Sequence, residues 1–355
     1  MGNKKRVLLG MSGGVDSSVS AILLQRQGYE VMGATMLLWE EECSANCGSR
    51  SAVEDAKAVC DQLGIEHHVL DFRKEFQHYV IDNFIDTYQK VRTPNPCIEC
   101  NKYMKFDLMY QKAKELGCEY IATGHYARTA YDETYGRYVL KKSKAKGKDQ
   151  TYVMYHMPKE LVEKVLFPLS DFESKEEIRA IAKEAGLTIA SKPESQEICF
   201  IPDNDYISFL DKHMTKKMEK GKVIDTKGMV LGDHQGLYRY TIGQRRGLGI
   251  SSTHPLYVVK LDEKQNVVIV GEEKDIFSTE LEVMDVHYLL MDQVEHPLEI
   301  TAKIRYSAKE VEATLIPLEN KEASVIFHQP VRAVTPGQSV VFYIGDCVLG
   351  GGKIK

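Results

Sequence analysis

Short apolar runs alternate with helix-like segments along the first part of the chain. Runs with the character of buried strands are residues 7–10, 30–39, 68–71 and 119–123. Residues 17–27 and 51–63 are predicted as helices, and each ends at a glycine, Gly28 and Gly64. This alternation predicts an α/β fold with helices on both faces of a parallel sheet, where ligands bind at the carboxyl ends of the strands.

The pattern changes at about Asp203. Residues 203–275 are rich in Gly, Lys and Arg, which predicts a small irregular central domain. From about Ile276, β-branched runs separated by polar turns predict short strands that close into a C-terminal β-barrel. We therefore expect three domains, 1–202, 203–275 and 276–355.

Composition narrows the class of protein. The 355 residues are 43% hydrophobic and 27% charged, which is ordinary for a protein with packed cores. No apolar run approaches the ~20 residues of a membrane helix, and the N-terminus does not resemble a signal peptide, so we expect a cytoplasmic protein. Eight cysteines do not suit a disulfide scaffold, and a net charge of −5 gives no overall preference for nucleic acid.

A loop rich in glycine and serine, "GMSGGVDSS", follows the first predicted strand at residues 10–18. Gly13 and Gly14 allow close backbone approach, Ser12 and Ser17 offer hydroxyls, and a helix N-terminus behind them suits an anion. The loop is neither a Walker A motif, because it has no lysine, nor G-x-G-x-x-G. A structural turn with a serine cap is the alternative interpretation.

Two cysteines, Cys97 and Cys100, stand at C-x-x-C spacing in "RTPNPCIECNKYMKF". This spacing is compatible with half a zinc site, a dithiol redox pair, part of an iron–sulfur site, or a nucleophile with a helper. Zinc is disfavoured because no second C-x-x-C or His pair follows at ligand spacing. Cys199, in "ESQEICFIP", taken alone is a buried core cysteine.

The string S-G-G-x-D-S in the first loop resembles the PP-loop ATP pyrophosphatases, which cleave ATP between the α and β phosphates and adenylate a substrate oxygen. Downstream segments resemble the bacterial tRNA-uridine 2-sulfurtransferases, which make 2-thiouridine at the wobble position, U34, of certain tRNAs. The segments are "RTPNPCIECNKYMKF", "IATGHYAR", "KDQTYVMY", "SQEICFIPD", "HQGLYRYTIGQRRGLGI" and "VTPGQSVVFYIGDCVLGGG". The resemblance runs in order from residue 5 to residue 352.

This resemblance implies an ATP site with Mg²⁺ near Asp16. Residues implied to bind ATP are Gly10, Met11, Ser12, Gly13, Gly14, Val15, Asp16, Ser17, Met36 and Gly124. Cys199 corresponds to the cysteine that receives a persulfide, and Cys100 to the second catalytic cysteine. The chemistry agrees, because adenylation makes the uracil oxygen a leaving group and a thiolate or persulfide can carry sulfur. A labile [4Fe–4S] cluster on Cys97, Cys100 and Cys199 is the alternative to the persulfide pair, which we favour.

The resemblance also implies contacts with tRNA. Residues at matching positions are Asn95, Pro96, Cys97, His125, Lys148, Asp149, Gln150, Arg245, Arg246, Arg305, Tyr306 and Gln338. The lysine-rich residues 141–148 suit phosphate contacts, although a solvated hairpin tip is the alternative, and Tyr306 could stack on a splayed base. The expected partners are tRNA and a sulfur donor such as a cysteine desulfurase or a sulfur-relay protein, and the expected state is a monomer.

One position departs from the family pattern. The usual turn reads N-P-D-x-x-C, whereas this chain has Cys97 in place of the aspartate. The motif therefore identifies no residue as the general base, and Glu99 is a candidate for that role. Two other functions remain open: a PP-loop ligase acting on a small molecule, and a non-catalytic RNA-binding module.

Overall fold

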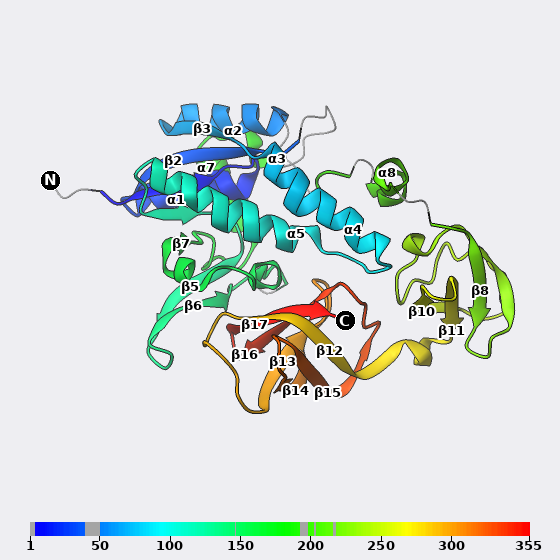
Figure 1. Ribbon diagram of the computed structural model, residues 1–355. Coiled ribbons are helices and arrows are strands. Elements are labelled where there is room, and N and C mark those ends of the chain that lie inside the picture. Colours follow the sequence, from blue (N-terminus) through cyan, green and yellow to red (C-terminus); the bar gives the residue numbers. More distant parts are fainter. Residues whose placement is uncertain (1–3, 40–49, 146, 192–197, 202–203, 216–217) are drawn as a thin grey trace.

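The computed structural model describes residues 4–39, 50–145, 147–191, 198–201, 204–215 and 218–355 (Figure 1). The N-terminal part contains a five-stranded parallel sheet in the order β3-β2-β1-β4-β7. The strands are β1 (Arg6–Gly10), β2 (Glu30–Leu37), β3 (Glu66–Asp71), β4 (Tyr120–Ala122) and β7 (Val165–Leu166). Helices α1 (Val15–Arg26), α2 (Arg50–Leu63) and α7 (Lys175–Glu184) accompany this sheet. The predicted α/β fold is confirmed.

The central strand of this sheet is buried on both faces. Leu8 belongs to one hydrophobic cluster and Val7 and Leu9 to a second, because successive side chains of a strand point to opposite faces. All three side chains are fully buried. A parallel strand covered on both sides is therefore a continuous apolar run, as the sequence shows here.

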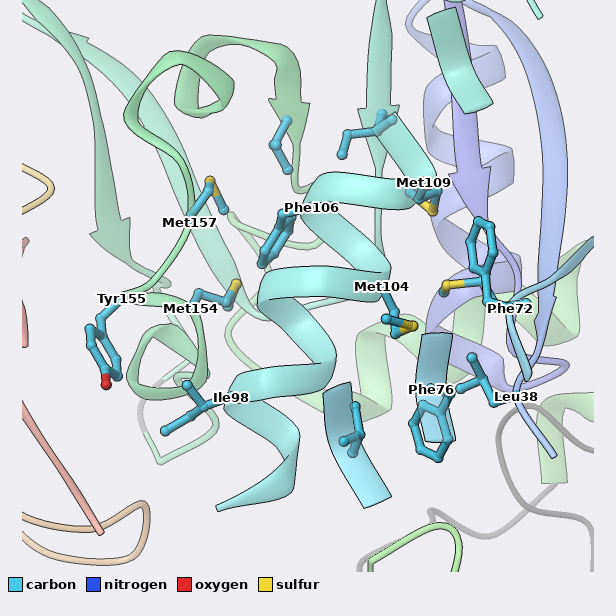
Figure 2. Packing of buried hydrophobic residues seen from close by; sticks show 14 of the residues in the cluster. Leu38, Phe72, Phe76, Ile98, Met104, Phe106, Met109, Met154, Tyr155 and Met157 are labelled. Carbon is cyan, nitrogen blue, oxygen red and sulfur yellow. The ribbon is translucent and has the colours of Figure 1, made fainter. Parts of the chain in front are cut away.

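A helical pair between β3 and β4 carries the C-x-x-C motif. Its first arm is α3 (Arg73–Phe76), the π-helical turn η1 (Gln77–Asp82) and α4 (Asn83–Gln89), and its second is α5 (Pro96–Glu99), the π-helical segment η2 (Cys100–Leu108) and α6 (Met109–Glu115). Figure 2 shows the second arm packed through a row of apolar side chains against its surroundings. Labelled members of this cluster are Leu38, Phe72, Phe76, Ile98, Met104, Phe106, Met109, Met154, Tyr155 and Met157. Single π-turns in helices are frequent at functional sites.

Short helical segments flank β7 and α7. Segments η3 (Thr151–Met154) and η4 (Lys159–Lys164) precede β7, while η5 (Thr188–Ser191) and the helix α8 (Tyr206–His213) follow α7. The expected boundary between domains, at residues 202 and 203, lies outside the described residues. Within the described residues, no helix is long and apolar enough to cross a membrane.

The central domain is an ordered four-stranded sheet, so the expectation of an irregular domain is wrong. Strands β8 (Gly221–Asp225), β9 (Val230–His234), β10 (Tyr257–Asp262) and β11 (Val267–Gly271) pair in the order β10-β11-β8-β9. Fully buried Val223, Val258, Val268 and Val270 form its core with Leu237 and neighbouring residues. In β8 and β9 the apolar residues stand among Gly, Lys and Asp, which hides the strand period, whereas β11 contains a continuous apolar run.

The C-terminal domain is the predicted β-barrel. Its strands are β12 (Phe277–Tyr288), β13 (Leu298–Lys303), β14 (Val311–Pro317), β15 (Ala323–Arg332), β16 (Ser339–Ile344) and β17 (Cys347–Ile354). They pair in the order β12-β15-β14-β13-β16-β17, and pairing of β12 with β17 closes the barrel.

A hairpin of the N-terminal part extends the barrel sheet. Strands β5 (Ala127–Asp132) and β6 (Arg137–Lys142) pair with each other, and β6 pairs with β17 where Lys141 faces Cys347. Figure 1 shows this hairpin beside the barrel. The N-terminal part and the barrel are therefore joined through a shared sheet.

Candidate active site

The serine-rich loop connects the end of β1 to the start of α1. Gly13 has a φ of +68° and packs against α2, where a Cβ would lie 2.9 Å from the Ala52 carbonyl oxygen. Ser17 Oγ accepts a hydrogen bond from Ser12 N at 3.2 Å and donates one to Gly14 O at 3.1 Å. Among the described residues, no side chain caps the first turn of α1 at Gly14. The positive end of this helix therefore suits an anion such as a phosphate.

Asp16, in the first turn of α1, forms an ion pair that the sequence did not reveal. Lys175 Nζ lies 2.6 Å from both carboxylate oxygens of Asp16, and Tyr126 donates its hydroxyl to Asp16 Oδ1 at 3.0 Å. Lys175 is 7% exposed and is the first residue of α7. Ser174 and Glu177 form a capping box that fixes the start of this helix. An S-x-x-E signal thus marks the helix start in the sequence, but nothing there identifies Asp16 as the partner.

Gly124 and Met36 border this loop from neighbouring strands. A Cβ on Gly124 would lie 2.9 Å from both Asp16 C and Ser17 N, so the backbone of the β4 end contacts the first turn of α1. Met36 is a nearly buried residue near the end of β2, and its neighbour Thr35 donates a hydrogen bond to Met11 O at 2.8 Å. The structure therefore brings these two predicted residues to the edge of the sheet that carries the loop.

His125 lies between η2 and the end of β4. Its Nδ1 is 2.8 Å from Thr123 Oγ1 and its Nε2 is 3.3 Å from Lys105 Nζ. Burial of the ring, with a smaller contribution from Lys105, holds the pKa of His125 well below its usual value. The ring is therefore neutral at pH 7, and Nδ1–H donating to Thr123 while Nε2 accepts from Lys105 satisfies both contacts.

Cys97 and Cys100 lie on α5 and at the start of η2. Asn95 caps α5, and its Oδ1 accepts a hydrogen bond from Cys97 N at 3.2 Å, while Pro96 occupies the first turn. Cys97 is exposed and Cys100 is half-buried. Asn95, which the resemblance places against tRNA, thus also has a local structural role.

Glu99 is buried on the same short helix. It is 8% exposed, and its Oε1 lies 3.0 Å from Lys353 Nζ of β17. Because an ammonium group already pairs with this carboxylate, Glu99 is engaged in a contact between domains.

Cys199 is brought to the same core as Cys100 by folding. Cys199 is half-buried, and the next residue, Phe200, packs edge-to-face against Phe76 and Phe84 with ring centroids 5.7 and 5.4 Å apart. Both cysteines pack against the hydrophobic cluster that includes these rings. The remaining residues of the "ESQE" segment lie outside the described residues.

The [4Fe–4S] alternative requires three cysteine thiols that lie together. Among the described residues, no group of three His, Cys, Asp or Glu side chains is close enough to hold a metal ion. The persulfide pair and a cluster on Cys97, Cys100 and Cys199 both stay predictions.

The lysine-rich segment is largely engaged in ion pairs. Lys141 and Lys142 lie on β6 rather than at a hairpin tip, and Lys146 lies outside the described residues. Lys141 pairs with Asp132 at 2.9 Å, Lys142 with Glu310 at 2.6 Å and Lys144 with Asp171 at 2.8 Å. Lys148 Nζ lies 6.0 Å from the centroid of the Tyr126 ring.

Asp149 and Gln150 hold the chain that follows this segment. Asp149 accepts hydrogen bonds from Ser143 N and from Thr151, and burial raises the pKa of its carboxyl above the usual value. Gln150 exchanges two hydrogen bonds with the backbone of Tyr126, at 2.8 and 2.9 Å. Both side chains therefore have partners within the protein.

The other residues implied to contact tRNA are spread over two domains. Arg245 and Arg246 are exposed on the central domain. On the barrel, Arg305 donates a hydrogen bond to Arg332 O at 3.2 Å, and Tyr306 is 44% exposed with its ring edge-to-face on Tyr152. Gln338 instead contacts the backbone that precedes the C-x-x-C motif.

A cavity of about 740 Å³ separates the helical pair from the barrel. Its lining includes Tyr79, Glu99, Lys102, His156, His287 and Lys353. The rings of His156 and His287 are stacked with centroids 5.1 Å apart. Burial, followed by the charge of Lys102, lowers the pKa of His156 to about 3, so the ring of His156 is neutral at pH 7.

A parallel sheet with a glycine- and serine-rich loop between β1 and α1 is the architecture of a nucleotide-binding α/β domain. Family models match nearly the whole chain: a tRNA methyl transferase HUP domain at residues 5–203, a tRNA methyl transferase PRC-barrel domain at 207–272 and an aminomethyltransferase beta-barrel domain at 278–354. The chain belongs to the family of tRNA-specific 2-thiouridylases.

Similar proteins cover this chain from end to end. The tRNA-specific 2-thiouridylase MnmA of Acetivibrio thermocellus is 51% identical, over 99% of this chain and 100% of the relative. That of Clostridioides difficile is 50% identical, over 99% of this chain and 98% of the relative.

Solved structures resemble the chain only distantly. The U34-tRNA thiolase NcsA from Methanococcus maripaludis, with its [4Fe–4S] cluster, is 21% identical with a TM-score of 0.36, over 59% of this chain and 65% of that chain. A 4-thiouridine synthetase in complex with RNA and ATP is 18% identical with a TM-score of 0.37, over 59% and 50%. Nothing about this chain is concluded from them.

Proposed function

We propose that this chain catalyses ATP-dependent 2-thiolation of the wobble uridine, U34, of tRNA. Full-length identity to tRNA-specific 2-thiouridylases supports this function. The observation that carries it is the presence, in one α/β domain, of a phosphate-binding loop and of two cysteines that pack on one core although they are far apart in sequence.

In the first step, ATP binds with its phosphates at the N-terminus of α1. The amides of this turn and Lys175 favour the negative charge of the leaving pyrophosphate. Carboxylate oxygens are ligands that Mg²⁺ prefers, but both oxygens of Asp16 contact Lys175, so Asp16 would hold Mg²⁺ beside the ATP phosphates only after Lys175 moves away. The O2 atom of the uridine attacks the α-phosphorus, the bond to the β-phosphate breaks, and pyrophosphate leaves.

The second step delivers sulfur. A donor, such as a cysteine desulfurase or a sulfur-relay protein, first converts the Cys199 thiol to a persulfide. The terminal sulfur attacks C2 of the adenylated uridine, and the Cys100 thiolate then attacks the Cys199 sulfur. The sulfur–sulfur bond to the transferred atom breaks, AMP leaves, and a Cys100–Cys199 disulfide forms. The two thiols supply the two electrons that reduce the sulfane sulfur, and an external thiol must reduce the disulfide before the next cycle.

The three parts of the chain divide this work in our proposal. Residues 1–202 bind ATP and carry the catalytic residues, while residues 203–275 and 276–355 bind tRNA. The chain acts as a monomer in the cytoplasm. Exposed Arg245, Arg246 and Tyr306 are suited to backbone contact and base stacking.

The two cysteines provide the test. Cys100→Ser and Cys199→Ser should each abolish formation of 2-thiouridine, while tRNA binding and tRNA-dependent release of pyrophosphate persist. Thiolation is measured by retardation of tRNA in a mercury-containing gel, and the Cys199 persulfide by the mass of its peptide after loading with the donor.

A third variant separates the persulfide pair from a cluster. Cys97→Ser removes a thiol that the persulfide route does not oxidise, so thiolation should continue in that variant, whereas a three-cysteine cluster would lose a ligand. Thiolation near the wild-type rate in Cys100→Ser or Cys199→Ser would refute the role given to that cysteine. Pyrophosphate release with a small acid and no tRNA would favour a ligase instead.

A further inference from the structure

We propose that the C-terminal barrel positions the catalytic cysteines, with Gln338 and Lys353 as the positioning residues. The inference rests on the proposed function, because it concerns the sulfur-transfer step. It assigns to the barrel a role beyond binding RNA. The segment concerned, residues 92–100, runs from the loop before α5 to Cys100 and is called the cysteine segment below.

The barrel holds the start of the cysteine segment by hydrogen bonds to its backbone. Gln338 Nε2 donates to Thr93 O and to Pro94 O, each at 3.0 Å. Thr93 N in turn donates to Pro336 O at 2.9 Å. These three contacts fix the residues just before Asn95, whose side chain caps α5. The point at which α5 begins is therefore set by the barrel.

The turn that makes these contacts is shaped for a close approach. Gly337 has a φ of +90°, and a Cβ there would lie 2.8 Å from Arg92 Cβ and 2.9 Å from Thr93 N. Only glycine combines this conformation with this separation. Gly337 N also donates to Ile354 O at 2.9 Å, which ties the turn to the end of β17.

A buried ion pair holds the other end of α5. Lys353 Nζ, on β17, lies 3.0 Å from Glu99 Oε1, and Glu99 is 8% exposed. Removal of the Lys353 ammonium would leave the Glu99 carboxylate buried without its cation, which is costly. Cys100 directly follows Glu99.

The barrel thus contacts the cysteine segment before Cys97, at Thr93 and Pro94, and again directly before Cys100, at Glu99. Sulfur transfer requires the Cys100 thiolate to meet the Cys199 sulfur in line, and a displacement of about 1 Å can slow such a step about a hundredfold. The resemblance implied that Gln338 touches tRNA, whereas here its Nε2 already serves two carbonyls of the cysteine segment.

The test compares Gln338→Ala and Lys353→Gln with the wild-type full-length chain. Lys353→Arg retains the cation, and Gln329→Ala, on an exposed site of the same barrel, is the matched control. Hydrogen exchange of residues 92–106 is followed without tRNA, and tRNA affinity, pyrophosphate release and single-turnover thiolation are followed separately. Both test variants should exchange faster in the cysteine segment and thiolate at least about tenfold more slowly, with tRNA affinity and pyrophosphate release unchanged. Lys353→Arg should recover most of the rate.

Two results would overturn the proposal. Weaker tRNA binding with unchanged exchange would make Gln338 an RNA contact, and unchanged exchange with unchanged thiolation would reduce both contacts to packing. If Gln338→Ala does not fold, Lys353→Gln and its arginine rescue still decide the question. A wild-type chain that does not thiolate tRNA would refute the proposed function while the exchange comparison still reports on the contact, so the two failures are distinguishable.

Discussion

Lys175 shows how a single side chain can complete the nucleotide site. Its ammonium is nearly buried and contacts both oxygens of Asp16, in the first turn of the helix that follows the serine-rich loop. A fixed cation beside the expected phosphates is the type of group that stabilises charge developing on a leaving pyrophosphate. Sequence separation explains why it was not predicted: Lys175 and Asp16 are 159 positions apart.

Replacing Lys175 by methionine should slow tRNA-dependent pyrophosphate release about a hundredfold, the usual loss when one preorganised charge is removed. Lys175→Arg should retain part of the rate. The rate is measured by coupled detection of pyrophosphate, with Lys183→Ala, an exposed lysine of the same helix, as the control. A Lys175→Met variant that releases pyrophosphate normally would show that the ion pair is only structural.

At the scale of elements, the contact between the end of β4 and the first turn of α1 sets the geometry of the ATP site. Gly124→Ala would place a Cβ 2.9 Å from backbone atoms of Asp16 and Ser17, which cannot move as a side chain can. We expect a loss of about 1–3 kcal/mol in the free energy of unfolding, typical of overpacking, together with weaker ATP binding. Chemical denaturation and nucleotide titration measure the two effects. Normal ATP affinity in this variant would mean that α1 can shift without disturbing the loop.

The strands and helices that could be predicted from the sequence each carry their own signal. β1 and β2 are continuous apolar runs, and α1 and α2 end before glycines with positive φ, Gly28 and Gly64. The β-branched runs of the barrel likewise predicted its strands. The sheet of the central domain was not predicted, because β8 and β9 are interrupted by Gly, Lys and Asp, although β11 is an apolar run.

Site residues followed a similar division. Loop residues and cysteines could be predicted as site residues through motifs, since each motif is local in sequence. Contacts made by folding were missed, among them Lys353 with Glu99 and the approach of Gln338 to Thr93 across 245 positions. Such contacts leave no local pattern, because each partner alone is an ordinary polar residue.

For the whole molecule, the cavity between the helical pair and the barrel makes stability depend on pH. Burial and the neighbouring Lys102, His287 and Lys353 lower the pKa of His156 to about 3, and burial also lowers that of His287. Below about pH 6.5 the histidine binds a proton in the unfolded chain but not in the folded chain. Its contribution to the free energy of unfolding is therefore fully present above that pH and is lost as the pH falls toward 3.

His156→Gln should therefore flatten the fall in the free energy of unfolding on acidification, which amounts to at most about 1.4 kcal/mol per pH unit for one such group. Urea denaturation at a series of pH values measures the slope. His296→Gln, on an exposed site of the barrel, is the control and should follow the wild type. Equal slopes in all three proteins would show that His156 is protonated in the folded state.

An acidic chain that binds tRNA must concentrate its positive charge locally, because its net charge of −5 opposes a polyanion. Arg245 and Arg246 lie exposed in the glycine-rich segment of the central domain, away from the ion pairs that engage Lys141, Lys142 and Lys144. If both guanidinium groups contact phosphates, replacing them by alanine removes two sites of counterion release. The slope of log K against log salt should then become less negative by roughly one unit per lost contact.

Filter binding of tRNA at a series of salt concentrations measures this slope. The double change Lys227→Ala and Lys264→Ala removes the same charge from exposed sites of the same domain, so it separates a contact from a change in net charge. A slope that shifts equally in both double variants would assign the effect to net charge, and an unchanged slope in the arginine variant would place these residues away from the RNA.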